Sequence, residues 1–247
     1  MSELERFAAL LKEMTGIVVR TDTPERIESR IKPLLKDHPH MDIGALVGFM
    51  RSNPKSALSR AVCEAMTVNE SYFFRDKTPF SIFEEIMLPE LAHNSKRSLQ
   101  KKIRIWCAAA STGQEPYSLG ITWLENKNKY SDWSLDVFAS DLSEEALDRA
   151  RLGQYNQFEV QRGLPINILV KYFTQEGANW KINAEVKEMI RFEQHNLLQS
   201  ASMLGEQDII FCRNVLIYFD VETKRKILDM LKSKLAPDGF LVLGSSE

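Results

Sequence analysis

Polar and charged residues stand at the ends of four apolar runs in this sequence. The run through Cys107 is followed by the segment Ser111-Thr112-Gly113-Gln114-Glu115. A second run ends at Asp141, a third near Asn196, and a fourth at Arg213-Asn214. If these runs are parallel strands of an open sheet, their carboxyl ends lie at one edge, where such sheets bind ligands. The four groups are therefore expected to share one ligand site.

The residue types at these ends suit a nucleoside ligand that carries positive charge. A turn at Gly113 lets a ligand approach the backbone closely, and an acid such as Asp141 can accept both hydroxyls of a ribose. The dinucleotide fingerprint requires three glycines and an acid about 20 residues further on. Here there is one glycine, and Asp141 lies 28 residues beyond it. Glu115 would repel a pyrophosphate but suits an amino group and a sulfonium, so S-adenosylmethionine is favoured over a nicotinamide dinucleotide.

Each of these residues also has an ordinary structural interpretation. A Ser-Thr-Gly sequence after a strand is typical of a plain turn. Asp141 can serve in the cap region of a following helix, and Asn214 can satisfy local backbone groups. The residue types alone leave both interpretations open.

The pattern after residue 102 predicts the sheet that would position these groups. Apolar runs alternate with helical patterns, as expected for a parallel, doubly wound α/β fold. Ser143 is expected to cap a helix that Gly153 ends. Expected strands cover 103–108, 135–140, 190–192, 209–212 and 240–243, and expected helices cover 115–125, 144–151 and 222–235. Residues 154–189 do not follow this alternation and indicate a small inserted subdomain.

The first 90 residues or so show helical patterns and no strand signal. Apolar residues from Leu4 to Met14 recur at helical spacing, and Gly16 is expected to end that helix. A second helix is expected to begin at Pro24 and to kink or end near Pro33. Two further helices are expected within 42–50 and 55–66. A polar, basic connection at 95–102 separates this all-α unit from the α/β part.

Composition excludes several classes of protein. The 247 residues include 32 Lys and Arg and 34 Asp and Glu, which gives a net charge of −2. This balance excludes nucleic-acid binding that is mainly electrostatic. The hydrophobic share of 44% excludes disorder as the main state. The longest apolar run, 105–110, is far shorter than the ~20 residues of a membrane span, and no signal peptide is recognisable at the start. Three cysteines without a CxxC pair suggest neither a disulfide framework nor a metal site. We expect a cytoplasmic protein without membrane insertion.

Several long sequence blocks resemble the chemotaxis receptor methyltransferase (CheR) family. They are MTVNESYFFRD (66–76), IRIWCAAASTGQEPYSL (103–119), ASDLSEEALDRARLGQY (139–155), FCRNVLIYFD (211–220) and LAPDGFLVLGSSE (235–247). The resemblance spans nearly the whole chain. It implies a Rossmann-like class I methyltransferase sheet with an N-terminal all-α domain and a small inserted β-subdomain. Its implied domains are a helical domain (1–75), a linker helix and connection (76–102) and the methyltransferase domain (103–247).

The resemblance also implies roles for individual residues toward S-adenosylmethionine. Asn69, Ser71 and Arg75 would reach its methionine portion, and Ser71 stands where the family usually has Thr. Glu115 would contact its amino acid end, and Asp141 would take the ribose hydroxyls. The remaining implied contacts are Asn196 and Leu197 beside the adenine, Arg213 and Asn214 under the sulfonium, and Tyr218 close to the transfer site.

The implied reaction methylates glutamate side chains of chemoreceptors, giving 5-O-methyl esters and S-adenosylhomocysteine for sensory adaptation. A glutamate carboxylate is ionised at neutral pH, so the reaction needs neither a base nor a metal. His195 therefore has no required catalytic role, and Tyr218 and Arg75 are expected to act by positioning only.

The implied partner is the cytoplasmic helical domain of a receptor, whose glutamates are negatively charged. The basic side of the second helix, Arg26, Arg30, Lys32 and Lys36, is expected to meet it, with an ordinary solvated face as the alternative. Some family members bind a receptor C-terminal pentapeptide through a glycine-containing loop. Residues 174–180 are shorter than that loop, so we expect no pentapeptide binding.

Two other functions remain as alternatives. One is a non-catalytic S-adenosylmethionine-binding sensor or scaffold, because binding and turnover use the same residues. The other is a methyltransferase for another substrate, such as a nucleic acid or a small molecule, which the balanced charge does little to support.

Overall fold

The computed structural model describes residues 1–38, 40–94 and 100–247, and its centre is a parallel sheet. Within these residues the sheet has five strands in the order β6-β2-β1-β7-β8, and every neighbouring pair is parallel. The strands are β1 (Lys102–Cys107), β2 (Ser134–Asp141), β6 (Ile190–Gln194), β7 (Gln207–Cys212) and β8 (Leu235–Leu243). The chain proceeds from β1 outward through β2 to β6, then crosses to β7 and β8 on the other side. The carboxyl ends of β1 and β7 therefore flank the switch point, where ligands of such sheets bind.

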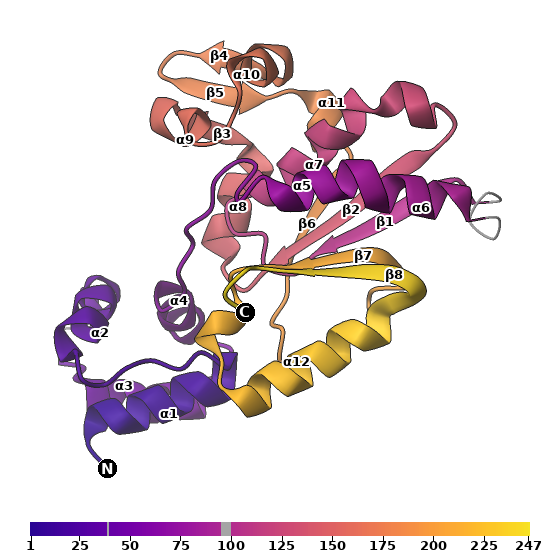
Figure 1. Ribbon diagram of the computed structural model, residues 1–247. Helices are drawn as coiled ribbons and strands as arrows, with labels where there is room; N and C mark the ends of the chain where they lie inside the picture. The colour runs from indigo at the N-terminus through magenta and orange to yellow at the C-terminus, as the bar shows by residue number, and fades with distance from the viewer. Residues whose placement is uncertain (39, 95–99) are drawn as a thin grey trace.

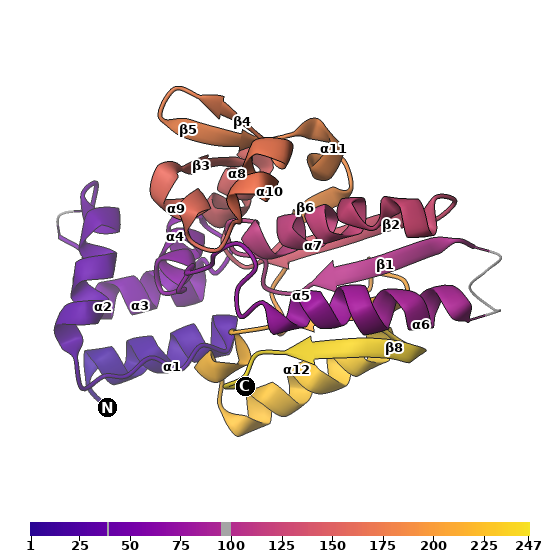
Figure 2. The same ribbon diagram turned by 45° about the horizontal axis from the view of Figure 1, so that its top comes forward.

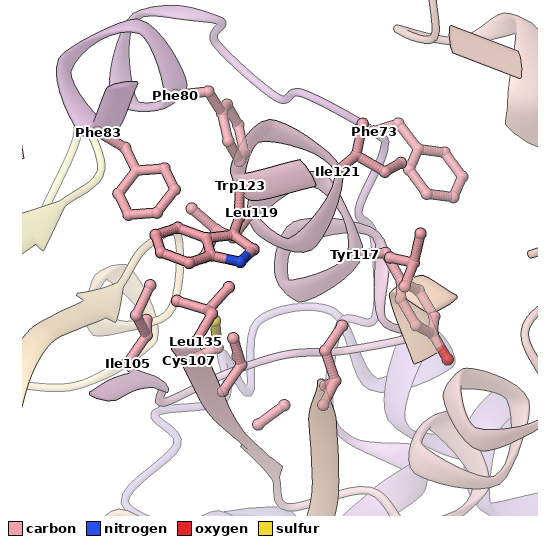
Figure 3. Close-up of a cluster of buried hydrophobic side chains, with 14 of the residues drawn as sticks. Phe73, Phe80, Phe83, Ile105, Cys107, Tyr117, Leu119, Ile121, Trp123 and Leu135 are labelled. Carbon is pink, nitrogen blue, oxygen red and sulfur yellow. The ribbon is translucent and has the colours of Figure 1, made fainter. Parts of the chain in front are cut away.

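Helices cover both faces of the sheet, so its central strands are buried on both sides. In β1, Ile105 and Cys107 belong to one core and Trp106 to the other. Figure 3 shows the first core, where Phe80 and Phe83 lie near Trp123. The helices around the sheet are α5 (Thr78–Ile82), the π-helical turn η2 (Phe83–Met87), α6 (Leu88–His93), α7 (Gln114–Glu125), α8 (Glu144–Leu152), α11 (Ala184–Lys187) and α12 (Val221–Lys234), with the 3-10 turns η3 (Lys127–Tyr130) and η4 (Leu216–Tyr218).

The N-terminal helices form a separate core beside the sheet (Figure 1). They are α1 (Glu3–Thr15), α2 (Pro24–Ile31), the 3-10 turn η1 (Lys32–Leu35), α3 (Ile43–Ser52) and α4 (Ala57–Ala65). The predicted end at Gly16 is confirmed, since this residue has φ 80° and its N–H bonds the Lys12 carbonyl. The predicted effect of Pro33 is also confirmed, because α2 gives way to the 3-10 turn there.

A small antiparallel sheet stands beside the main one (Figures 1 and 2). Its order is β3-β5-β4, and it packs with two short helices. The elements are β3 (Gln154–Asn156), α9 (Gln157–Gln161), α10 (Ile166–Tyr172), β4 (Phe173–Glu176) and β5 (Asn179–Ile182). The rings of Tyr155 and Phe173 meet Phe73 edge-on, with centroids 4.9 and 5.4 Å away. The insert thus packs against the segment that joins the helical unit to α5.

The last strand differs from the sequence prediction. Strand pairing begins at Leu235 instead of Phe240, directly after α12. Its register shifts, because Gln207 pairs with Leu235 whereas Ile209 pairs with Phe240. The predicted turn residues Pro237-Asp238-Gly239 occupy this bulge, where a proline without an N–H is tolerated.

Two sequence expectations concern features outside the sheet. Of the basic connection expected at 95–102, residues 95–99 lie outside the described residues, and β1 begins at Lys102. Among the helices of the described part of the chain, none combines the length and apolar composition that crossing a bilayer requires.

Candidate functional site

A pocket lies at the carboxyl ends of β1, β2, β6 and β7. Its empty space is about 920 Å³, including a mouth open to solvent. It is also lined by residues from the end of α1 and from the segment after α4. Every residue predicted above for cofactor binding or catalysis lines it: Asn69, Ser71, Arg75, Glu115, Asp141, Asn196, Leu197, Arg213, Asn214 and Tyr218.

Asp141 ends β2 with its carboxylate fixed by two backbone donors. Its Oδ2 accepts a hydrogen bond from the Ser111 N–H at 2.8 Å and its Oδ1 one from the Ser143 N–H at 3.0 Å. The N-cap of α8 is Ser143, whose Oγ accepts from the Ala146 N–H. Burial raises the pKa of Asp141, and the backbone donors oppose that rise. A buried carboxylate with lone pairs to spare is suited to accept hydroxyl groups.

Glu115 and Arg213 form a buried ion pair between α7 and the end of β7. The Nη1 of Arg213 donates to Oε2 of Glu115 at 2.6 Å. Its Nη2 donates to Oδ2 of Asp76 at 2.8 Å and to the Arg75 carbonyl at 2.9 Å. Burial raises the pKa of Glu115, although the guanidinium of Arg213 opposes this. Arg213 therefore links Glu115 to the segment that carries Arg75.

The segment Met66–Arg75 forms one wall of the pocket. Nη1 of Arg75 donates to the Glu70 carbonyl at 2.9 Å, and its guanidinium carbon lies 5.5 Å from the centre of the Tyr72 ring. Arg162, from the insert, lies 4.3 Å from the same ring and pairs with Glu70 at 2.8 Å. The insert thus braces this wall from outside.

Another part of the pocket lining joins the helical unit to the loop after β6. Nδ2 of Asn196 donates to the Met14 carbonyl at 2.8 Å, and its Oδ1 accepts from the Leu198 N–H at 3.0 Å. Ile17 forms an isolated bridge with Phe219, a pairing that no strand pattern in the first 90 residues predicts. The end of α1 is therefore part of the pocket.

Some pocket residues were not singled out as ligand contacts by the sequence. Ser111 follows the end of a strand, a position at which ligands bind in such sheets, whereas His195 was considered only as a general base. Burial lowers the pKa of His195. Glu70 and Asp76 flank recognised residues, but nothing in the sequence indicates their ionic partners.

Three buried polar atoms of the pocket lining test the fit of S-adenosylmethionine. Ser111 Oγ, His195 Nε2 and Arg213 Nε are buried and have no hydrogen-bond partner within the described residues. Buried polar atoms normally have partners, so these indicate a polar ligand. The carboxylates of Asp141 and Glu115 suit a ribose and a cationic ligand, and Arg75 suits a carboxylate. The residues present fit this cofactor.

The residues predicted for substrate docking lie apart from the pocket lining. The side chains of Arg26 on α2, Lys32 on η1 and Lys36 directly after η1 are exposed. Arg30 is half-buried, and its Nη1 donates to the carbonyls of Ala65 and Thr67 at 3.1 and 3.0 Å. Part of this guanidinium thus tethers α2 to the start of the pocket wall. Among the described residues, no cluster of His, Cys, Asp and Glu side chains has the arrangement of a metal site.

Comparison with known proteins gives a consistent result. The profile described as "CheR methyltransferase, SAM binding domain" matches residues 69–247. A "Chemotaxis protein methyltransferase" of Vibrio anguillarum is 37% identical, over 99% of this chain and 88% of that protein. "Chemotaxis protein methyltransferase Cher2" of Pseudomonas putida is 34% identical, over 99% of this chain and 90% of its own length. The "Chemotaxis protein methyltransferase" of Salmonella typhimurium is also 34% identical, over 100% of this chain and 83% of that protein.

Proposed function

We propose, because the chain belongs to the CheR methyltransferase family, that it methylates glutamate side chains of a chemoreceptor with S-adenosylmethionine as the donor. The products would be glutamate 5-O-methyl esters and S-adenosylhomocysteine. The observation that carries the proposal is the convergence of the predicted residues on one pocket at the switch point of the sheet. A site of that position and charge suits a nucleoside with a cationic amino acid tail.

The chain's own residues would divide the binding of the cofactor among three walls. Asp141 would accept the ribose hydroxyls, and Ser111 and His195 lie beside it with unused polar atoms. Glu115 would hold the amino group with the lone pairs that Arg213 leaves unused. Asn69, Ser71 and Arg75 would face the methionine carboxylate, while Leu197 with Asn196 would flank the adenine, and Asn214 would lie under the sulfonium.

Bound S-adenosylmethionine supplies a methyl group activated by the positive charge of its sulfur. The acceptor glutamate is ionised at neutral pH, with an ordinary pKa near 4.3. The protein therefore needs no general base, and its work is alignment and the exclusion of water. Tyr218 and Arg75, which both line the pocket, are the residues we assign to positioning the acceptor carboxylate.

We infer that the acidic helices of the receptor dock on the basic side of α2 and η1. Arg26, Lys32 and Lys36 are exposed there, and complementary charge steers association. Charge reversal at Lys32 and Lys36 is expected to raise KM for the receptor and to weaken its dependence on salt. Charge reversal at Lys226, exposed on α12, is the matched control.

We also propose that receptor binding does not use a C-terminal pentapeptide tether. The hairpin between β4 and β5 turns within two residues at Gly177-Ala178, and Gly177 has φ 63°. Micromolar binding of such a pentapeptide in a fluorescence titration would contradict this.

We also propose a division of the chain into functional units. Residues 1–75 are assigned to receptor docking, 76–102 to the connection and 103–247 to methyl transfer.

The proposed function is tested by methyl transfer to receptors. Membranes that contain candidate chemoreceptors are incubated with the protein and S-adenosylmethionine labelled in the methyl group, then treated with alkali. Label that alkali releases from the receptor as methanol identifies carboxyl methyl esters. Tight S-adenosylhomocysteine binding without transfer to any receptor would instead identify a sensor or scaffold.

A further inference from the structure

The side chain of Glu247 binds the turn that follows β7. Within the described residues its carboxylate accepts hydrogen bonds from backbone N–H groups only, and most of them belong to consecutive residues. Oε1 accepts from Val215, Leu216 and Ile217 at 3.0, 2.8 and 3.3 Å, and Oε2 accepts from Asn214 and Gly244 at 2.5 and 3.0 Å.

These donors have no partners of their own in a turn of this shape. The first N–H groups of a helical turn lack acceptors within it, and here they belong to the start of η4 (Leu216–Tyr218). Asn214 has φ 58°, a conformation that a non-glycine residue adopts only at some energetic expense. A carboxylate that collects such N–H groups satisfies them and favours the left-handed backbone that aligns them.

The end of β8 is shaped to bring this carboxylate into place. Leu243 pairs with Cys212 in parallel register, so residue 244 lies next to the start of the turn. A Cβ on Gly244 would lie 2.5 Å from Oε2 of Glu247 and 3.1 Å from the backbone N of Asn214. A side chain at this position would therefore displace the Glu247 carboxylate. Figures 1 and 2 both place the end of the chain beside the turn that leads to α12.

The same turn carries the functional residues of one pocket wall. Arg213, Asn214, Val215 and Tyr218 all line the pocket. We propose that Glu247 is a positioning residue for methyl transfer, which fixes the turn so that Asn214 meets the cofactor and Tyr218 meets the acceptor carboxylate. This inference rests on the proposed function. Glu247 itself is not among the residues that line the pocket.

The Glu247→Gln variant tests the proposal with little change of shape. In this variant an amide nitrogen replaces one carboxylate oxygen. That nitrogen is a donor, so it cannot accept the hydrogen bonds of the N–H groups that it faces. The kcat for receptor methylation is expected to fall about 10- to 100-fold, the usual range for a misplaced reacting group, with KM for the receptor within about twofold. Amide exchange at residues 214–217 should accelerate. Ser246→Ala, at an exposed neighbour, should change neither quantity.

A second pair of variants keeps the test decisive if the glutamine variant does not fold. Glu247→Asp retains the charge but withdraws it by one methylene, and Gly244→Ala pushes the carboxylate away without altering it. Both should accelerate exchange at 214–217 and lower kcat. Wild-type kcat despite faster exchange would overturn the proposal, as would unchanged exchange in all three variants.

Binding of S-adenosylhomocysteine separates this inference from the proposed function. In the glutamine variant its Kd should rise about 5- to 10-fold, because one of several cofactor contacts loses its support. If wild-type protein binds S-adenosylhomocysteine but methylates no receptor, the proposed function fails. Amide exchange at residues 214–217 and the Kd for S-adenosylhomocysteine in the variants then still decide whether Glu247 orders the turn. An unchanged Kd would count against that role.

Discussion

Replacement of Asp141 by asparagine is expected to weaken cofactor binding sharply while leaving the protein folded. The substitution preserves size and shape but removes the charge. Because both carboxylate oxygens accept backbone N–H groups, from Ser111 and Ser143, an amide nitrogen at either position faces a donor. One buried N–H is thus left without an acceptor, which destabilises the fold by about 1–3 kcal/mol.

The loss of affinity can be worked out from the same geometry. A ribose hydroxyl that donates to an ionised acceptor contributes about 1.5–3 kcal/mol. The asparagine retains one carbonyl oxygen, so the loss corresponds to one such bond. At about 1.4 kcal/mol for each factor of ten, the Kd for S-adenosylhomocysteine should rise about 10- to 150-fold.

Isothermal titration with S-adenosylhomocysteine measures this change, and urea unfolding verifies the folded state. The matched control is Asp148→Asn on α8, where the carboxylate is 71% exposed. An analogue of the product without the ribose hydroxyls should bind the Asp141→Asn variant and the wild type with nearly equal affinity. Without the hydroxyls, the carboxylate has no ligand group to bind, so its removal changes little. A Kd within about threefold of wild type for the natural product would refute the assignment of Asp141 to the ribose, since even one such bond is worth more.

Three further predictions concern pH, the insert and the buried arginine. Burial raises the pKa values of Glu115 and Asp141 above their ordinary values of 4.5 and 3.8. The unliganded fold therefore loses stability as the pH rises from these ordinary values through the raised ones. Cofactor binding, in contrast, needs the ionised carboxylates. The Kd for S-adenosylhomocysteine should increase as pH falls through the same range in a titration series, and a flat profile would contradict this. Gly163→Ala places a Cβ 1.9 Å from the Phe73 carbonyl at φ 102° and should lower the free energy of unfolding by about 3 kcal/mol in urea, while Gly205→Ala, with open space around it, should change it little. Arg213→Met leaves the buried carboxylate of Glu115 without its partner, whereas the Asp76 carboxylate is 42% exposed. The variant should therefore lower the free energy of unfolding by about 3–5 kcal/mol in the same assay. A loss below about 1 kcal/mol would contradict this, because an unpaired buried charge costs more.

Local signals explain what the sequence predicts well. Ser143 and Gly153 limit α8 as expected, because caps depend on residues within a turn of each other. The positions of Asp141 and Arg213 at strand ends follow from alternating apolar runs and helices. The structure adds the partners of Asp141, whose carboxylate accepts hydrogen bonds from the Ser111 and Ser143 N–H groups.

Contacts between distant segments explain what the sequence does not predict. Asn196 bonds to Met14, 182 residues away, and Arg162 pairs with Glu70 across 92 residues. No periodicity records such pairs, because they depend on how complete units pack. The basic side of α2 illustrates the same limit: spacing groups Arg30 with Lys32, but only the fold shows that Arg30 turns toward Ala65.

Strained backbone at and beside the pocket suits a site that works by positioning. Of the six described non-glycine residues with positive φ, Ser111 and Asn214 line the pocket, with φ values of 49° and 58°, and Phe74, with φ 52°, directly precedes the pocket residue Arg75. The N–H of each is held by a side chain from elsewhere in the chain. Phe74 donates to Ser118 at 3.0 Å, Ser111 to Asp141 at 2.8 Å, and Asn214 to Glu247 at 2.5 Å.

Strained backbone persists only where surrounding contacts over-determine it. A reaction that needs no acid or base gains most from fixed geometry, because alignment of the reacting atoms is then the main contribution the protein can make. We therefore propose that the three side-chain acceptors, Ser118, Asp141 and Glu247, contribute to the alignment of the reacting atoms.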